Sequence, residues 1–156
     1  MVWSYSAFAL TRDDAALVFP LVRAAAPEID LGRWQDFTYV LIGESSSCSG
    51  AIGIRNAAGY VCGLLVFHTE HDLRRGLVLA VSLFIALDLV KDAEAARALT
   101  EAAEAKVREL GCSAVHIRLG LTQKNLAKRL AAVGHHSEAI LFSKEIGRPP
   151  SGICRA

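Results

Sequence analysis

Hydrophobic and polar residues alternate with two different periods along this chain, and the period predicts where strands and helices lie. Alternating or continuously apolar stretches predict strands, and apolar residues spaced three or four apart predict helices. The expected strands are at 5–10, 51–56, 60–69, 77–90, 113–119 and 139–146. The expected helices lie between Thr11 and Pro27, between Asp30 and Gly43, at 93–110, and between Thr122 and Gly134.

The boundaries of these elements carry the residues that helix ends prefer. Thr11 with Asp14 three positions later is a capping pair, and Asp30 and Thr122 are N-cap candidates. Gly111 follows the third helix, where a glycine commonly ends a helix.

The expected strand at 77–90 is apolar on both faces, apart from Ser82 inside the run. A strand of this kind belongs inside a sheet that is covered on both sides. The predicted order is therefore β-α-α-β-β-β-α-β-α-β, an α+β fold with a mixed sheet flanked by helices. We expect one domain at 1–147, followed by a loose tail at 148–156.

Three local sequences in this order carry a family resemblance. The long strand closes with Asp88, Leu89 and Val90. The third helix reads R-A-L-T-E-A-A-E from Arg97 and ends in R-E-L-G-C, while Asn125 and Gly134 bracket the fourth helix. Together they resemble the GNAT superfamily, the acyl-CoA-dependent N-acyltransferases. The resemblance implies acetyl-CoA or another acyl-CoA as co-substrate.

The chain departs from the family pattern at the phosphate-binding turn. GNAT enzymes hold the pyrophosphate with an Arg/Gln-x-x-Gly-x-Gly/Ala sequence, in which glycine lets the backbone approach the phosphates. With Arg97 in register, Lys91, Glu94 and Ala96 occupy the signature positions, so glutamate stands where glycine is expected. Acidic groups in the first turn stabilise a helix but repel a pyrophosphate. No tyrosine follows Tyr60, so the tyrosine acid of many family members is also missing.

The resemblance still implies a set of candidate site residues. Asp88 and His116 are the candidate bases for an amine acceptor. The candidate cofactor-binding residues are Leu89, Val90, Lys91, Ala96, Arg97, Asn125 and Lys128. For most of these positions a structural role, such as a core strand residue or an ordinary basic helix face, is equally compatible with the sequence.

Two functions remain open at this stage. One is a GNAT-type N-acyltransferase that moves an acetyl or other acyl group from acyl-CoA to a primary amine on a small molecule or peptide. The other is a non-catalytic GNAT-like module for self-association or partner binding that has lost the pyrophosphate cradle. A homodimer is compatible with the sequence.

Composition and the terminal sequence limit the binding partners and the cellular compartment that we expect for this protein. A formal net charge of +1 does not suggest a nucleic-acid binder, and the longest apolar run is too short to span a membrane. The four cysteines are widely spaced without a C-x-x-C pair, so no metal site is expected. The N-terminus lacks a secretory pattern, and we expect a cytoplasmic protein.

Overall fold

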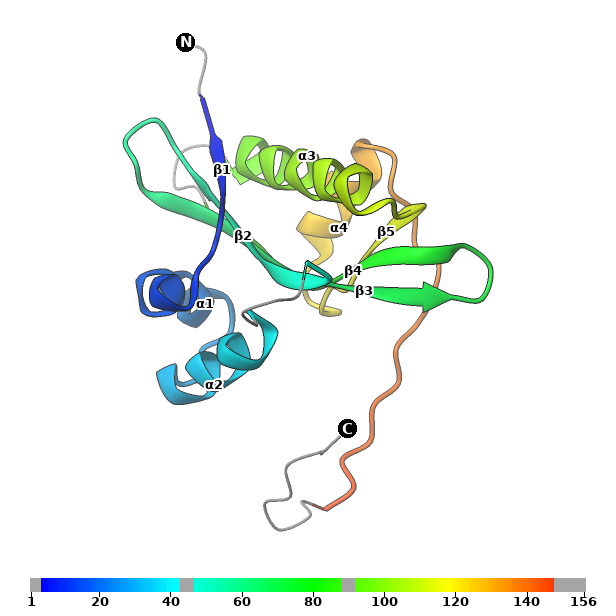
Figure 1. The fold of residues 1–156 in the computed structure, drawn as a ribbon, viewed down its shortest axis with the longest axis horizontal. Helices are drawn as coiled ribbons and strands as arrows, with labels where there is room; N and C mark the ends of the chain where they lie inside the picture. Colours follow the sequence, from blue (N-terminus) through cyan, green and yellow to red (C-terminus); the bar gives the residue numbers. More distant parts are fainter. Residues whose placement is uncertain (1–3, 43–46, 88–91, 148–156) are drawn as a thin grey trace.

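The computed structural model describes residues 4–42, 47–87 and 92–147, which form one sheet with helices on both faces (Figure 1). The α+β class predicted from the sequence is confirmed. The elements in chain order are β1 Ser6–Ala9, a 3-10 turn Arg12–Asp14, α1 Ala15–Ala25, α2 Leu31–Leu41, β2 Ser49–Arg55, β3 Val61–Asp72, β4 Gly76–Ala86, α3 Asp92–Leu110, β5 Ala114–Ile117 and α4 Lys124–Ala132.

The sheet has the order β1-β2-β3-β4-β5. The three pairs formed by β1 to β4 are antiparallel, and β5 is parallel to β4. A parallel pair needs a crossover, which α3 supplies. β4 lies between β3 and β5 with Leu79 and Val81 almost fully buried, as the apolar run predicted.

Alternate residues of each strand supply two hydrophobic layers. Leu65 and Phe67 of β3 pack toward α3 and α4, with Leu99 and Leu130 from these helices. Leu64 and Val66 pack on the other face, toward α1 and α2, with Val22 and Trp34. Strand side chains alternate between faces, so one strand contributes to both layers.

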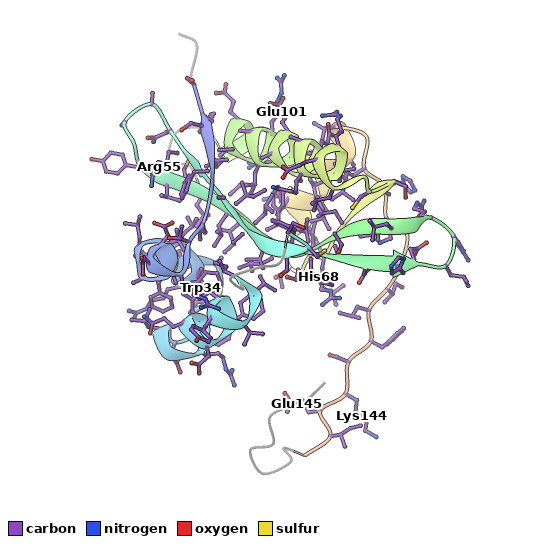
Figure 2. All side chains as sticks on the ribbon, in the orientation of Figure 1. Trp34, Arg55, His68, Glu101, Lys144 and Glu145 are labelled. Carbon is purple, nitrogen blue, oxygen red and sulfur yellow. The ribbon has the colours of Figure 1, made fainter. Side chains whose placement is uncertain are left out.

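Side-chain hydrogen bonds define where α1 and α2 begin and how they dock. Asp30 Oδ1 accepts the N–H of Arg33 at 2.7 Å, which confirms the predicted N-cap. Asp14 Oδ2 accepts the N–H of Thr11 at 2.8 Å. The buried indole of Trp34 donates to the carbonyl of Ala15 at 2.8 Å, and the side chain lies between the two helices (Figure 2).

Two sequence predictions are corrected. The expected strand at 139–146 is not a strand, because this exposed stretch pairs with no other strand in the described part of the chain. Thr122 does not cap α4; the cap position is Gln123, whose side chain accepts the N–H of Gly120 at 2.7 Å. In the ranges that the structure describes, none of the helices has the length and apolar character needed to cross a membrane.

Candidate active site

The pairing between β4 and β5 stops part-way along β4. Val81 pairs with Ile117, and the N–H of Arg118 donates to the carbonyl of Val81 at 2.9 Å. β4 continues to Ala86, but among the described residues no strand pairs with its β5-facing edge beyond this point. β4 is therefore paired with β5 along its first half but not along its second half. The peptide groups on this open edge of β4 are able to hydrogen-bond a ligand.

A β-bulge in β4 lies at the start of this open half. Phe67 pairs with Val81 and Val66 pairs with Leu83, so Ser82 is an extra residue on β4. The Ser82 hydroxyl reaches the carbonyl of Val66 at 3.5 Å. A bulge bends a strand and increases its twist, which explains why pairing with β5 ends at the preceding residue, Val81. Ser82 was visible in the sequence as a polar residue in an apolar run, but its role in the sheet was not predicted.

The first turns of α3 pack closely on the sheet through small side chains. Ala95 and Ala96 are buried, and the hydroxyl of Thr100 donates to the carbonyl of Ala96 at 2.8 Å. Ala96 was a candidate cofactor contact, and the structure places its side chain in the core. A cofactor role for Ala96 through its backbone stays a prediction.

Arg97 and Arg129 line the same narrow gap between α3 and α4. The gap has a volume of about 20 Å³, so it is too small for more than a water molecule. Arg97 Nε donates to Glu101 Oε1 at 3.0 Å, and both side chains are largely exposed. Glu101 lies on the side of α3 that points away from the sheet (Figure 2). The sequence grouped Arg129 with the basic residues of α4 but gave no sign that it faces Arg97.

The remaining candidates for phosphate contact divide into two groups. Asn125 and Lys128 lie exposed on α4 and do not line the gap. Asp88, Leu89, Val90 and Lys91 lie outside the described residues. Their proposed roles stay predictions.

His116, the second candidate base, lies on β5 opposite Ala80 of β4. Its Nδ1 is 3.9 Å from Glu70 Oε1 and its Nε2 is 3.8 Å from Glu138 Oε2. Nε2 is buried and has no hydrogen-bond partner among the described residues. His68 lies near the same group, with Nε2 at 3.4 Å from Glu70 Oε2. His116 therefore faces two carboxylates on the sheet face that is opposite α3.

Neighbouring groups favour the ionised form of two carboxylates beside His116, those of Glu138 and Asp72. Arg75 hydrogen-bonds both carboxylate oxygens of Glu138 and lowers the pKa of that carboxyl. Asp72 accepts the N–H groups of Arg74 and Arg75 at 2.8 Å each, which lowers its pKa in the same way. Among the described side chains, no group of three His, Cys, Asp or Glu is arranged to hold a metal ion.

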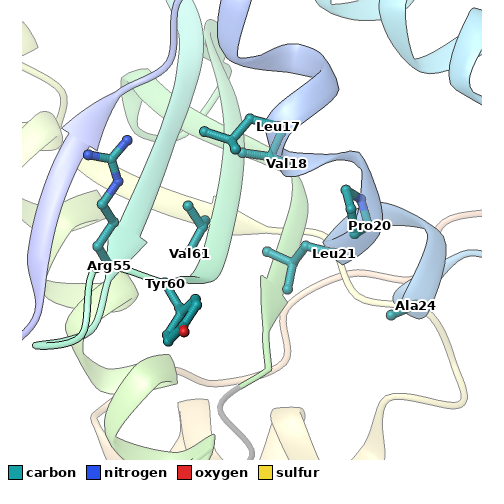
Figure 3. A pocket seen from close by; sticks show the side chains of 9 residues that line it. Leu17, Val18, Pro20, Leu21, Ala24, Arg55, Tyr60 and Val61 are labelled. Carbon is teal, nitrogen blue, oxygen red and sulfur yellow. The ribbon is translucent and has the colours of Figure 1, made fainter.

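A hollow of about 460 Å³ lies on the α1 side of the sheet (Figure 3). Its apolar wall comes from α1, and its other wall comes from the end of the β2–β3 hairpin. The principal lining residues are Leu17, Pro20, Leu21, Arg55, Tyr60 and Val61. The N–H of Leu87 donates to the carbonyl of Cys62 at 2.8 Å, so the end of β4 lies next to this wall.

The comparisons with known proteins identify the architecture. No family model matches the chain, and no curated protein matches it. An aminoglycoside N-acetyltransferase AAC(6')-Iy in complex with CoA has a TM-score of 0.78 and 12% identity, covering 93% of this chain and 97% of that one. The chain has the GNAT fold. The family resemblance drawn from the sequence is confirmed at this level.

Two further solved structures agree with this GNAT assignment. The ribosomal-protein-alanine N-acetyltransferase of Brucella melitensis biovar Abortus 2308 has a TM-score of 0.72 and 17% identity, covering 92% of this chain and 100% of that one. The aminoglycoside 6'-N-acetyltransferase AAC(6')-Ih of Acinetobacter baumannii has a TM-score of 0.73 and 13% identity, with the same coverage. At these identities the GNAT fold is shared, and the substrates are properties of those proteins.

Proposed function

We propose that this chain is a GNAT-type N-acyltransferase that moves an acetyl or other acyl group from acyl-CoA to a primary amine. The observation that supports the proposal most is the open second half of β4, which begins at the Ser82 bulge and leads toward α3. Peptide groups along this edge are able to hydrogen-bond the acyl carbonyl and the pantetheine arm. Fixed donors of this kind stabilise charge that develops on a carbonyl oxygen.

The residues around the start of α3 fit a diphosphate on the protein surface. Arg97, which is ion-paired with Glu101, and Arg129 both line one gap, and Asn125 and Lys128 add polar groups from α4. Glu94, half-buried in the first turn of α3, opposes an anion at the same place. We therefore expect acyl-CoA to bind with the arginines as its principal cations and with lower affinity than a glycine-lined turn would give.

Acyl transfer requires that the two substrates are held in position and that one proton leaves the acceptor amine. The acceptor nitrogen forms a bond to the thioester carbon, the carbon–sulfur bond breaks, and the CoA thiolate leaves and takes up a proton. His116 stays the candidate base among the described residues; it lies opposite Ala80 on the same strand pair as the bulge, six residues before the end of β4. Ser82 is two residues beyond Ala80, and two residues of a strand span roughly 7 Å. Asp88 is proposed as a second base from the sequence alone.

The α1 hollow is the proposed acceptor site. It lies on the face opposite α3, so donor and acceptor approach the open edge from opposite sides. Its apolar wall suits the body of a small molecule or peptide side chain, and Arg55 and Tyr60 offer polar groups at the rim.

Calorimetric titration with acetyl-CoA tests the donor site. We expect saturable binding that Arg97→Ala and Arg129→Ala each weaken by about tenfold or more, because a charge-assisted hydrogen bond contributes about 1.5–3 kcal/mol. Arg108→Ala is the matched control, since Arg108 also forms an i,i+4 ion pair on α3, with Glu104 at 3.5 Å. Absence of binding to the wild-type chain would remove the transferase proposal.

A non-catalytic GNAT-like module is the second candidate function, and Glu94 in place of a glycine favours it. Native mass spectrometry separates the two candidates, because a transferase should retain or acquire a CoA species. Acetylation of a panel of primary amines, read by release of free CoA thiol, then tests turnover. A chain that neither binds a CoA species nor acetylates any amine of the panel would support the module.

A further inference from the structure

Of the described residues that line the α1 hollow, Arg55 alone carries a charge. The hollow is walled mostly by apolar groups, with Leu17 and Leu21 of α1 across from Arg55 (Figure 3). A cation beside apolar groups attracts an anion more strongly than a cation in open water, because fewer solvent dipoles screen it. The hollow therefore combines an apolar wall with a single positive group.

Stacking on an aromatic ring holds the Arg55 side chain in place. Arg55 is the last residue of β2, opposite Ser6 of β1, and its Cζ lies 4.1 Å from the centre of the Phe8 ring. The ring in turn lies over Gly53, which pairs with Phe8. A guanidinium stacked in this way keeps the N–H groups along its edge able to donate. A side chain that is already ordered loses less conformational freedom when it binds an anion.

Within the part of the chain that the structure describes, no carboxylate forms an ion pair with Arg55. The arginine ion pairs there belong to other positions, namely Arg75 with Glu138, Arg97 with Glu101 and Arg108 with Glu104. Arg55 is half-buried, so folding has already removed part of its hydration. A cation in this state gains from an anion that a ligand supplies.

A second stacked arginine shows how a structural role differs. Arg12 Cζ lies 3.9 Å from the centre of the Tyr39 ring, and its guanidinium donates to the carbonyls of Ile42 and Tyr39 at 2.9 and 3.1 Å. These bonds tie the 3-10 turn to the end of α2. The Arg55 guanidinium makes no such bond to any residue that the structure describes. Its donors are therefore left for a ligand.

We propose that Arg55 binds the carboxylate of an apolar amino acid whose side chain packs on the α1 wall of the hollow. A carboxylate has one charge and two coplanar oxygens, which match one guanidinium fork. A phosphate monoester, with a charge near −2, would be only half compensated by this single cation. The volume of about 460 Å³ lies in the range of about 300–1,000 Å³ that small-molecule sites have. That this amino acid is the acyl acceptor rests on the proposed function, but its binding does not.

Three ligands with the same phenylethyl body separate the groups that the site recognises. L-Phenylalanine carries an amine and a carboxylate, 3-phenylpropanoate carries only the carboxylate, and phenethylamine carries only the amine. In calorimetric titrations without acyl-CoA, we expect both carboxylates to bind and phenethylamine to bind at least tenfold more weakly. Phenethylamine binding as tight as that of phenylalanine, or no saturable binding of either carboxylate at millimolar concentration, overturns the proposal.

Substitutions in the full chain locate the carboxylate. Arg55→Met keeps an unbranched stem against Phe8 and should weaken both carboxylates at least tenfold, with the far-ultraviolet circular dichroism unchanged. Leu17→Glu, at a 57% exposed position of the opposite wall, supplies a competing carboxylate and should weaken them as well. Arg23→Met is the matched control, because Arg23 is exposed on α1 and does not line the hollow. Full affinity in Arg55→Met overturns the proposal.

The acetyl-CoA titration reports on the proposed function separately. Carboxylate-dependent binding by a chain that binds no acetyl-CoA would support the Arg55 site and remove only acyl transfer. Saturable acetyl-CoA binding by a chain that binds neither carboxylate would overturn the Arg55 site alone.

Discussion

Val81 and Phe84 of β4 both pack into the layer under α3, although a regular strand would place residues three apart on opposite faces. The bulge at Ser82 accounts for this, since it inserts one residue between them. The same residue marks where β4 and β5 separate. The geometry of the proposed donor site therefore depends on one inserted residue.

Deleting Ser82 should close the open edge without exchanging the two faces of β4. Val81 and Phe84 would then follow a regular alternation, the strand would straighten, and β5 would be able to pair further along it. We expect a folded protein whose acetyl-CoA affinity falls at least tenfold in calorimetric titration. Ser82→Ala should keep the bulge and most of the affinity. Equal binding by the deletion variant would show that the bulge does not form the donor site.

Replacing Trp34 by Phe should destabilise the α1–α2 pair. The indole is 2% exposed and its Nε1–H donates to the carbonyl of Ala15 at 2.8 Å. Loss of the donor leaves a buried acceptor with one partner fewer, and the smaller ring leaves unfilled space. We expect the free energy of unfolding in urea to fall by about 1–3 kcal/mol. Phe37→Leu, a change at a 42% exposed position on the same helix, should stay within ~0.5 kcal/mol.

Gly53 on β2 is covered by the ring of Phe8 on β1. A Cβ atom at Gly53 would lie 2.5 Å from the ring carbon Cζ of Phe8, so the ring would have to move. Gly53→Ala should cost about 1–3 kcal/mol of unfolding free energy, as overpacking usually does. Gly147→Ala meets no atom within 4 Å and serves as the control in the same thermal or urea measurements. Unchanged stability of Gly53→Ala would mean that the β1 strand adapts freely.

The Arg75–Glu138 contact should make stability depend on pH in the acid range. The Arg75 guanidinium lowers the pKa of Glu138 in the folded protein, so the folded state holds this proton less tightly than the unfolded chain. The stabilisation is then fully present above the unfolded pKa and is lost as pH falls through the lowered folded pKa. Glu138→Gln should therefore show a weaker loss of stability on acidification.

Urea unfolding at a series of pH values from neutral to acid measures this difference. Glu109→Gln is the comparison variant, because its ion pair with Lys106 at 2.8 Å lies within α3 and holds no distant segment. A Glu138→Gln curve parallel to that of the wild type would contradict the assignment of the pKa shift to Arg75.

Local patterns determined most of the elements of this protein. The Asp30 cap, the apolar period of α3 and the two-sided apolar run of β4 are properties of neighbouring residues, so the printed sequence was enough to predict them. The family resemblance through α3 likewise rests on consecutive residues. These predictions survived because packing and local preference favour the same structure.

Only the tertiary structure decided the features on which the proposed function depends. Ser82 becomes a bulge because Val66 pairs with Leu83 and Phe67 with Val81. Arg129 and Arg97 line one gap because α4 packs on α3, and Glu138 meets Arg75 and His116 from a distant part of the chain. Residues 139–146 have the composition of a strand, yet they pair with no strand among the described residues, and a strand requires a paired neighbour as well as a favourable composition. Contacts between remote segments carry no period in the sequence, because they arise from how whole elements pack.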